Sequence, residues 1–248
     1  MRAASLSKAL DAPMVARVMA STVAAIVVAA GRGERLGVGR RKQYADLGGI
    51  PILARTLLAF EECVSVSALV LVIPAGDDAL VREQILSPHG IRKIGPGALV
   101  PGGGTRRESV AAGLAAVPAS ADVVLVHDGV RPLVSTALIE RVVEAARAHG
   151  AAVPVLPAKD TIKRGGKGWL AETLDRSTLF LAQTPQGFRA ELLRRAHGQP
   201  GPDAYDDGQL VERLGQAVAS VPGDVQNLKI TTPEDMAIAE VLLAMRVR

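Results

Sequence analysis

The sequence predicts an α/β domain in which helices cover both faces of a mostly parallel sheet. Short apolar runs alternate with segments of helical period along the 248 residues, which is the order of successive βα units. The apolar runs are hydrophobic at consecutive positions, as in strands that are buried on both faces. A glycine-rich loop follows the first run, at the place where open α/β sheets bind their ligands.

The first nine predicted elements alternate between strand and helix. The first run consists almost wholly of Ala, Val and Ile, so it is a buried strand. Pro51 marks the start of the next helix, because proline suits the first helical turn. The run near residue 98 is the weakest of the strands. The predicted strands are 22–30, 68–73, 98–100, 122–127 and 151–156, and the predicted helices are 51–62, 77–86, 105–116 and 135–149.

The alternation breaks after Leu156. Residues 159–174 are polar, contain the single tryptophan, Trp169, and predict two strands around a glycine-rich turn. A two-stranded hairpin is seldom stable by itself. We therefore expect this arm, about 157–177, to pack on a second subunit.

The α/β pattern resumes after the arm. Lys229 is predicted to lie in a strand that ends at Thr231, just before the last helix. The sequence shows no internal repeat and no long linker, so we expect one domain over 21–248 with the arm inserted in it. The remaining predicted elements are helices over 189–197, 205–214 and 233–245 and a strand over 217–221.

Composition excludes several classes of protein and site. A single cysteine, Cys63, excludes a disulfide framework and a cysteine-built zinc site. The four histidines lack metal-ligand spacing, and six aromatic residues are too few for a surface that stacks single-stranded nucleic acid. The net charge is +4, and the stretch from Gly31 to Lys42 alone carries that excess. Such a focused cationic segment indicates an anionic ligand rather than nucleic acid.

The first 20 residues show little periodic pattern, and we expect them to form a disordered extension. The apolar run over 18–30 is too short to span a bilayer, so we expect no membrane partner. Its positive flank leaves a secretory signal as one alternative and a short transit peptide as another. We expect the protein to be cytoplasmic.

The most informative motif is the loop Ala29-Ala-Gly-Arg-Gly-Glu-Arg-Leu, directly after the first strand. Its glycines, Gly31 and Gly33, allow backbone N–H groups to approach an anion closely. Leu36 stands where a dinucleotide-binding loop needs a third glycine, and no P-loop string occurs. With its own cations and the following Lys42-Gln-Tyr, the loop suits a triphosphate. The alternative is a solvated basic loop.

Two further motifs follow later strands. Gly102-Gly-Gly-Thr-Arg-Arg-Glu-Ser precedes a helix, and its Arg106 and Ser109 can bond a base or a phosphate; a flexible turn capped by Thr105 is the alternative. Val126-His-Asp-Gly-Val-Arg-Pro lies at the end of the fourth predicted strand. Its Asp128 can orient a hydroxyl or help to hold a metal, and its Arg131 can bind a phosphate, unless the two form a structural ion pair. We expect His127 to point into the protein interior.

Three weaker strings complete the set: Asp160-Thr-Ile-Lys with Asp175-Arg176, Gln183-Thr-Pro-Gln-Gly-Phe, and Asn227-Leu-Lys-Ile-Thr. Taken in order, the six strings resemble one family, the 2-C-methyl-D-erythritol 4-phosphate cytidylyltransferases, over nearly the whole chain. The resemblance implies a Rossmann-like nucleotidyltransferase fold and a homodimer joined through the arm. It also implies that CTP and the sugar-alcohol phosphate react to give a CDP-alcohol and pyrophosphate, with Mg²⁺.

The resemblance also implies roles for individual residues. Arg35 and Lys42 match residues that stabilise charge on the attacked α-phosphate, and with Arg176 and Lys229 they are the candidate catalytic residues. The candidate nucleotide-binding residues are Ala29, Ala30, Gly31, Gly33, Gly103, Arg106, Ser109 and Gly129. The candidate residues for the sugar phosphate are Asp128, Arg131, Thr161, Arg176 and Lys229, with Arg176 acting across the dimer interface. Mg²⁺ is expected mainly on the CTP phosphates, with Asp128 as a candidate ligand.

The chain departs from the family pattern at three positions. Tyr205 stands where threonine is usual, Arg41 where proline is common, and Gly129 where alanine is usual. Two other functions stay open: a cytidylyltransferase for another polyol phosphate, such as ribitol 5-phosphate, and a nucleotide-binding protein without catalysis. Intact Arg35, Lys42, Asp128 and Lys229 argue against the second of these.

Overall fold

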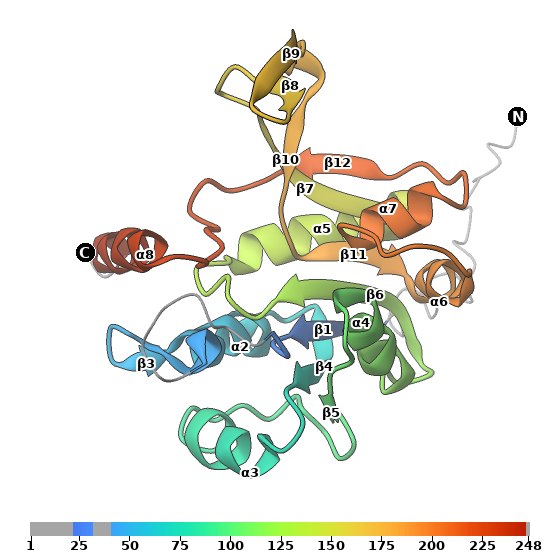
Figure 1. The fold of residues 1–248 in the computed structure, drawn as a ribbon. Coiled ribbons are helices and arrows are strands. Elements are labelled where there is room, and N and C mark those ends of the chain that lie inside the picture. The colour runs from blue at the N-terminus through green and yellow to red at the C-terminus, as the bar shows by residue number, and fades with distance from the viewer. Residues whose placement is uncertain (1–21, 32–40, 247–248) are drawn as a thin grey trace, which may run out of the picture.

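A computed structural model describes residues 22–31 and 41–246. The expected extension over 1–20 lies outside these residues, as do Gly33 and Arg35. Within the described residues the centre of the molecule is an eight-stranded sheet (Figure 1). Its strands, in the order in which they pair, are β10 (Phe180–Ala182), β7 (Ala151–Pro157), β11 (Gln186–Arg189), β6 (Ala121–Asp128), β1 (Thr22–Val28), β4 (Val66–Ile73) and β5 (Leu99–Pro101), with β12 (Ala219–Pro222) also paired to β7.

The sheet is mostly parallel, as predicted. β1 lies between β4 and β6 and is parallel to both, and β5 continues the parallel arrangement beyond β4. β12 is parallel to β7. β11 and β10 are antiparallel to their neighbours, and β11 lies between β6 and β7.

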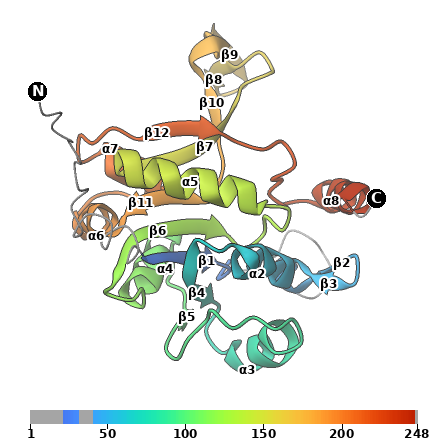
Figure 2. The same cartoon turned by 180° about the vertical axis from the view of Figure 1, so that it is seen from behind.

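Helices cover both faces of the sheet, which also agrees with the prediction. Alternate residues of β1 point to opposite sides: Val23 and Val27 join one apolar cluster, and Ala24 and Ile26 join another. α2 (Ile52–Glu62) and α5 (Thr136–His149) cover the first face, seen toward the viewer in Figure 2. α4 (Arg106–Ala115), α6 (Ala190–Gly198) and α7 (Asp207–Glu212) cover the second (Figure 1).

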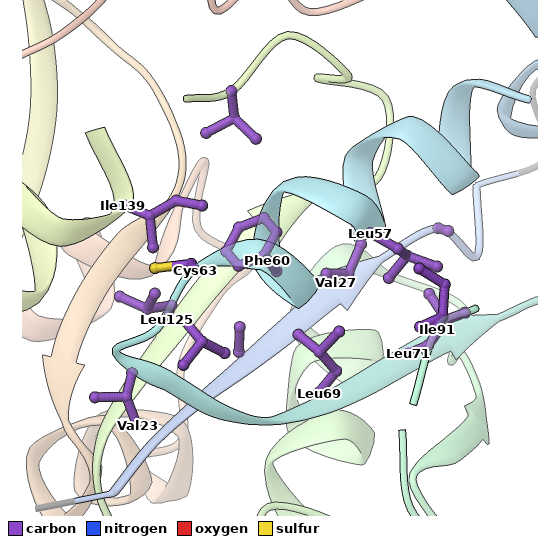
Figure 3. Packing of buried hydrophobic residues seen from close by; sticks show 14 of the residues in the cluster. Val23, Val27, Leu57, Phe60, Cys63, Leu69, Leu71, Ile91, Leu125 and Ile139 are labelled. Atoms are coloured by element: carbon purple, nitrogen blue, oxygen red, sulfur yellow. The ribbon is translucent and has the colours of Figure 1, made fainter. Parts of the chain in front are cut away.

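The core on the first face is built around α2. Figure 3 shows Phe60 of this helix, which is fully buried, between the sheet and Ile139 of α5. The last helix, α8 (Pro233–Arg246), packs through Ala239 on a smaller cluster that includes Leu47 and Ile230. Leu47 belongs to a short hairpin of β2 (Asp46–Leu47) and β3 (Ile50–Pro51) that the sequence analysis did not predict.

The predicted arm contains a hairpin of β8 (Lys163–Gly166) and β9 (Trp169–Thr173), which stands away from the sheet (Figure 1). The described chain then returns through a 3₁₀ turn, η4 (Arg176–Thr178), to β10. Both strands of the hairpin are exposed along their whole length.

Three predictions of local structure were wrong or incomplete. The helix over 77–86 is divided into α3 (Asp78–Val81) and a π-helical turn, η3 (Arg82–Leu86). The strands β10 and β11 were not predicted. Lys229 does not lie in a strand: its neighbour Ile230 donates one backbone hydrogen bond to Val130, and side chains hold the rest of the segment.

Candidate functional site

A cavity of about 640 Å³ lies at the carboxyl ends of β1 and β6. This is the side of a parallel sheet on which ligands of α/β proteins bind. Three walls enclose it: the start of the loop after β1 with the turn that follows, the loop before α4, and the end of β6 with the segment before α8. The lining residues are Val28, Ala29, Ala30, Gly31, Lys42, Gln43, Gly103, Gly104, Thr105, Arg106, Ser109, Asp128, Val130, Lys229 and Thr231.

The first wall is held together by Gln43. Its side-chain amide donates to the carbonyl oxygens of Ala29 at 2.8 Å and of Gly31 at 3.2 Å. Gln43 belongs to a 3₁₀ turn, η2 (Lys42–Tyr44), and is 2% exposed. A buried amide that bonds two backbone carbonyls fixes the turn against the end of β1. Lys42, which lines the cavity, therefore extends from a fixed backbone.

A second anchor holds the same turn from outside. The guanidinium of Arg41 and the hydroxyl of Tyr44 both donate to Asp77 Oδ2, each at 2.8 Å. Burial and the bond to Asp77 raise the pKa of the Tyr44 phenol above its ordinary value, so it stays protonated as a donor. The departure from the family pattern at Arg41 thus supplies an ion pair beside Lys42.

The second wall is the glycine-rich loop that leads into α4. Thr105 caps this helix in a capping box with Glu108, as the alternative interpretation of this loop predicted. The same loop lines the cavity, so capping and ligand binding are compatible. Ser109 Oγ donates to the Thr105 carbonyl at 2.9 Å and accepts from the Gly103 N–H at 3.1 Å. A Cβ on Gly102 would lie 2.2 Å from Ala30 Cβ, so only glycine allows the two loops to meet.

The third wall gathers charge around Asp128. Lys229 Nζ lies 3.0 Å from Asp128 Oδ2, Arg131 Nε lies 3.4 Å from the same oxygen, and Arg106 Nε lies 4.0 Å from Oδ1. Burial alone would raise the pKa of Asp128. The three cations, with Lys229 first, outweigh burial and hold that pKa well below its usual value. The Asp128 carboxylate is therefore ionised throughout the physiological pH range. It carries one negative charge, and three cations lie near it.

Side chains rather than a strand hold Lys229 in place. Arg131 Nη1 donates to the Asn227 carbonyl at 2.8 Å, and Asn227 Nδ2 donates to the Thr184 carbonyl at 2.8 Å. Gln183 Nε2 donates to the Asp224 carbonyl at 2.8 Å. The strings that begin at Gln183 and Asn227 therefore fix the segment before α8 to the end of β6.

His127 is fully buried, as predicted, and packs against Phe60 with the ring centroids 4.9 Å apart. Its Nδ1 lies 3.1 Å from the Thr184 hydroxyl, which also accepts from the Asp128 N–H at 3.0 Å. Burial, the largest influence, lowers the pKa of His127 to about 3. The neutral ring thus helps to fix the backbone of Asp128.

The depressed pKa of His127 makes the stability of the fold sensitive to acid. Below about pH 6.5 the unfolded chain takes up a proton that the folded ring refuses, so the free energy of unfolding should fall by up to about 1.4 kcal/mol per pH unit. Urea titrations between pH 7 and pH 5 measure this slope. His127→Asn keeps an acceptor for Thr184 and cannot protonate, so its slope should be shallower. Equal slopes in the two proteins would contradict the assignment.

The cavity brings together nine of the predicted site residues, and four others in the described chain do not line it. Gly129 and Arg131 adjoin the cavity without lining it; Gly129 bonds its N–H to the Val28 carbonyl. Thr161 and Arg176 lie on the arm, and Arg176 is exposed and donates to the Lys159 carbonyl. The nine lining residues that were predicted are Ala29, Ala30, Gly31, Lys42, Gly103, Arg106, Ser109, Asp128 and Lys229.

Sequence reasoning missed the part played by Gln43. The residue stands inside the Lys42-Gln-Tyr string, but nothing in that string shows that its amide reaches back to the end of β1. Val28, Gly104, Thr105, Val130 and Thr231 also line the cavity. Of these, Thr231 bonds Asp235 through both its N–H and its hydroxyl, close to the start of α8.

The described part of the cavity lining offers a single acidic side chain to a metal ion. Asp128 is the one carboxylate among the described lining residues, and no group of three acidic, histidine or cysteine side chains in the described ranges could hold a metal ion. Mg²⁺ is commonly bound by one or two carboxylates together with phosphate oxygens. The described residues therefore fit a magnesium ion that phosphates mainly hold.

None of the described helices is long and apolar enough to cross a membrane.

Comparisons with known proteins identify a family that this chain resembles over most of its length. The family model described as "IspD: 2-C-methyl-D-erythritol 4-phosphate cytidylyltransferase" matches residues 23–245. A protein of that name from Pelotomaculum thermopropionicum is 45% identical over 90% of this chain and 95% of its own. The bifunctional enzyme IspD/IspF from Desulforudis audaxviator is 51% identical over 91% of this chain, which spans 57% of that enzyme.

Solved structures of named family members have the same fold. The 4-diphosphocytidyl-2C-methyl-D-erythritol synthase of Anaerococcus prevotii has a TM-score of 0.81 and 30% identity, over 92% of this chain and 99% of that chain. The 2-C-methyl-D-erythritol 4-phosphate cytidylyltransferase of Thermus thermophilus has a TM-score of 0.71 and 37% identity, over 90% and 99%. By family match, identity and fold, this chain belongs to the 2-C-methyl-D-erythritol 4-phosphate cytidylyltransferase family.

Proposed function

We propose that the protein transfers the cytidylyl group of CTP to 2-C-methyl-D-erythritol 4-phosphate. The products are 4-diphosphocytidyl-2-C-methyl-D-erythritol and pyrophosphate, and the reaction is a step of non-mevalonate isoprenoid precursor synthesis. The observation that supports this best is that one cavity is lined by glycine-rich backbone on one side and by charged side chains on the other. Glycine-rich backbone and Lys42 line one side, and the Asp128–Lys229 pair lines the other.

The three walls of the cavity suit the two substrates. Gly103 and Ser109 lie where backbone and hydroxyl groups can bond a base, and the backbone of Ala29–Gly31 with Lys42 can hold phosphates. Asp128 accepts hydrogen bonds as an anion, so it can orient a substrate hydroxyl. Lys229, which is 44% exposed, can bind the phosphate of the sugar alcohol beside it.

The chemistry needs charge and alignment more than proton transfer. An oxygen of the alcohol's phosphate attacks the α-phosphorus of CTP, and the bond from that phosphorus to pyrophosphate breaks. The attacking oxygen is already ionised, so no general base is required. Lys42 and Lys229 supply positive charge around the phosphorus, where negative charge develops in the transition state. A bound Mg²⁺ would neutralise phosphate charge, with Asp128 as its candidate protein ligand.

The experiment that tests the function is pyrophosphate release from CTP with Mg²⁺. Methylerythritol phosphate and ribitol 5-phosphate are supplied in separate reactions. Release with the first supports the proposal, and release with ribitol 5-phosphate alone would move the protein to the second activity. CTP binding without release in either reaction would indicate a nucleotide-binding protein without catalysis.

The proposal includes a homodimer that forms through the arm. Four large apolar side chains on the arm and on β10 are exposed: Trp169 (81%), Leu170, Phe180 and Leu181. Such a concentration of exposed apolar area favours a protein partner. Thr161 and Arg176 lie on the same arm, so in a dimer they would be carried toward the partner's cavity. The proposal also places the reaction in the cytoplasm.

Replacing Trp169 with aspartate should shift the protein from dimer to monomer, because a charge would be buried among the apolar side chains of the arm. Sedimentation velocity at micromolar concentration measures the change. Val64→Asp is the matched control, since Val64 is exposed and lies between α2 and β4, outside the arm. A wild-type protein that sediments as a monomer would contradict the proposed dimer.

A further inference from the structure

Arg106 lies in the wall of the cavity between two carboxylates. Its Nη1 is 2.8 Å from Asp207 Oδ2, and its Nε is 4.0 Å from Asp128 Oδ1. Arg106 is the first residue of α4, Asp207 lies in the first turn of α7, and Asp128 is the last residue of β6. One of these carboxylates, Asp128, lines the cavity, and Asp207 does not. Asp207 therefore holds the guanidinium from behind the wall.

Asp207 is a completely buried carboxylate, with 0% of its side chain exposed. Its Oδ1 is 2.9 Å from Nε2 of His197 on α6, and its N–H donates to Gln186 Oε1. A buried charge is costly unless it is paired, and Arg106 is the cation that pairs it. Gln186 also accepts from the Gly208 N–H, so the backbone around Asp207 is fixed as well.

His197 orients the Asp207 carboxylate at some expense of folding stability. Its side chain is 4% exposed, and within the described part of the chain its Nδ1 has no hydrogen-bond partner. An unpaired buried nitrogen is destabilising, and an apolar side chain of similar size would avoid it. The arrangement of His197 favours the orientation of Asp207 over maximal stability.

The consequence for a ligand follows from the length of the arginine side chain. A free arginine loses much rotamer entropy when it is ordered. Where Asp207 has ordered it already, a ligand does not bear that cost, and binding is tighter. Without Asp207, the guanidinium could close the 4.0 Å separation from Asp128 and compete there with Lys229. Both substrates would then meet an altered wall.

We propose that Asp207, oriented by His197, is a positioning residue that holds Arg106 in the geometry that binds CTP. This inference rests on the proposed function and on Arg106, a candidate nucleotide-binding residue that lines the cavity. Asp207 acts only through Arg106, so its removal should matter only while Arg106 is present. If Asp207 only stabilised the fold, its removal would weaken CTP binding by the same factor whether or not Arg106 is present.

The test is a double-mutant cycle on Asp207→Asn and Arg106→Met. The readouts are kcat/KM for CTP, at saturating methylerythritol phosphate, and the Kd for CTP from calorimetry without the alcohol. We expect Asp207→Asn to weaken CTP binding about tenfold in the presence of Arg106 and to have an effect within about twofold in the Arg106→Met background. Equal losses in both backgrounds would overturn the proposal. Asp203→Asn, at an exposed carboxylate near α7, is the matched control.

A second pair of variants keeps the test decisive if Asp207→Asn does not fold. His197→Gln retains a side-chain N–H donor for Asp207, and His197→Leu does not. The proposal requires CTP binding to be weaker in His197→Leu than in His197→Gln, with His149→Leu, at an exposed histidine, unchanged. Equal affinities in the two His197 variants would overturn it.

Failure of the inference and failure of the proposed function give different results. If the wild-type protein releases pyrophosphate and the cycle is additive, the positioning role alone is wrong. If the wild-type protein binds CTP but releases no pyrophosphate with either alcohol, the proposed function is wrong, and the cycle can still be measured on CTP binding.

Discussion

Replacing Lys42 with alanine should lower kcat for pyrophosphate release by about 10²–10³-fold. Lys42 lines the cavity from the turn η2, on the wall proposed for the triphosphate. Gln43 and the Arg41–Asp77 pair hold that turn on either side of Lys42. The substitution therefore removes charge while the backbone around it keeps its place.

Initial rates at saturating CTP and methylerythritol phosphate measure this effect, and thermal unfolding checks the fold. Arg194→Ala is the control, because it removes an exposed cation of α6 outside the cavity lining. We expect the melting temperatures of the two variants to be similar. An unchanged kcat in Lys42→Ala would remove Lys42 from the chemical step.

Replacing Lys229 with methionine should lower kcat/KM for methylerythritol phosphate by about a hundredfold. The ammonium group is 3.0 Å from Asp128 and faces the cavity, so its loss removes a phosphate-binding charge and leaves Asp128 with weaker compensation. The pKa of Asp128 should then rise toward its ordinary value. We expect the acid limb of the rate profile to move to higher pH in the variant.

The loss of Lys229 should affect one substrate more than the other. KM for methylerythritol phosphate should rise more than KM for CTP, because Lys229 belongs to the wall assigned to the alcohol. Arg92→Met, at an exposed cation on the connection before β5, is the control. A loss confined to the KM for CTP would place Lys229 on the nucleotide instead.

The fold and most of the candidate site could be predicted from the sequence, because the signals were local. Long apolar runs mark β1, β4 and β6, and the segments after β1, β5 and β6 carry glycines and charged residues. A parallel sheet brings the carboxyl ends of such strands to the same edge. That is why residues as far apart as Ala29, Gly103 and Asp128 meet in one cavity.

The parts that could not be predicted depend on long-range contacts. β11 is short and begins with Gln186, whose side chain bonds Asp206 and the backbone of α7; no apolar run marks it as a strand inside the sheet. The segment around Lys229 has an apolar, strand-like pattern, but buried side chains hold it in place of strand pairing. Arg106 was expected to bind the nucleotide, but its ion pair with Asp207 could not be read from positions 101 residues apart in the chain.

The short edge strands β5 and β12 bear on how the protein avoids aggregation. β5 has three residues and ends at Pro101, and β12 has four residues and ends at Pro222. Short edge strands that contain proline offer few unpaired N–H groups to a strand of another molecule. Edge-to-edge association of these strands should therefore be unfavourable. Large apolar side chains that could cause self-association are exposed on the arm and β10, and others are exposed on α8. If copies associate through the arm, as proposed, the contact can end in a closed pair rather than an open fibre.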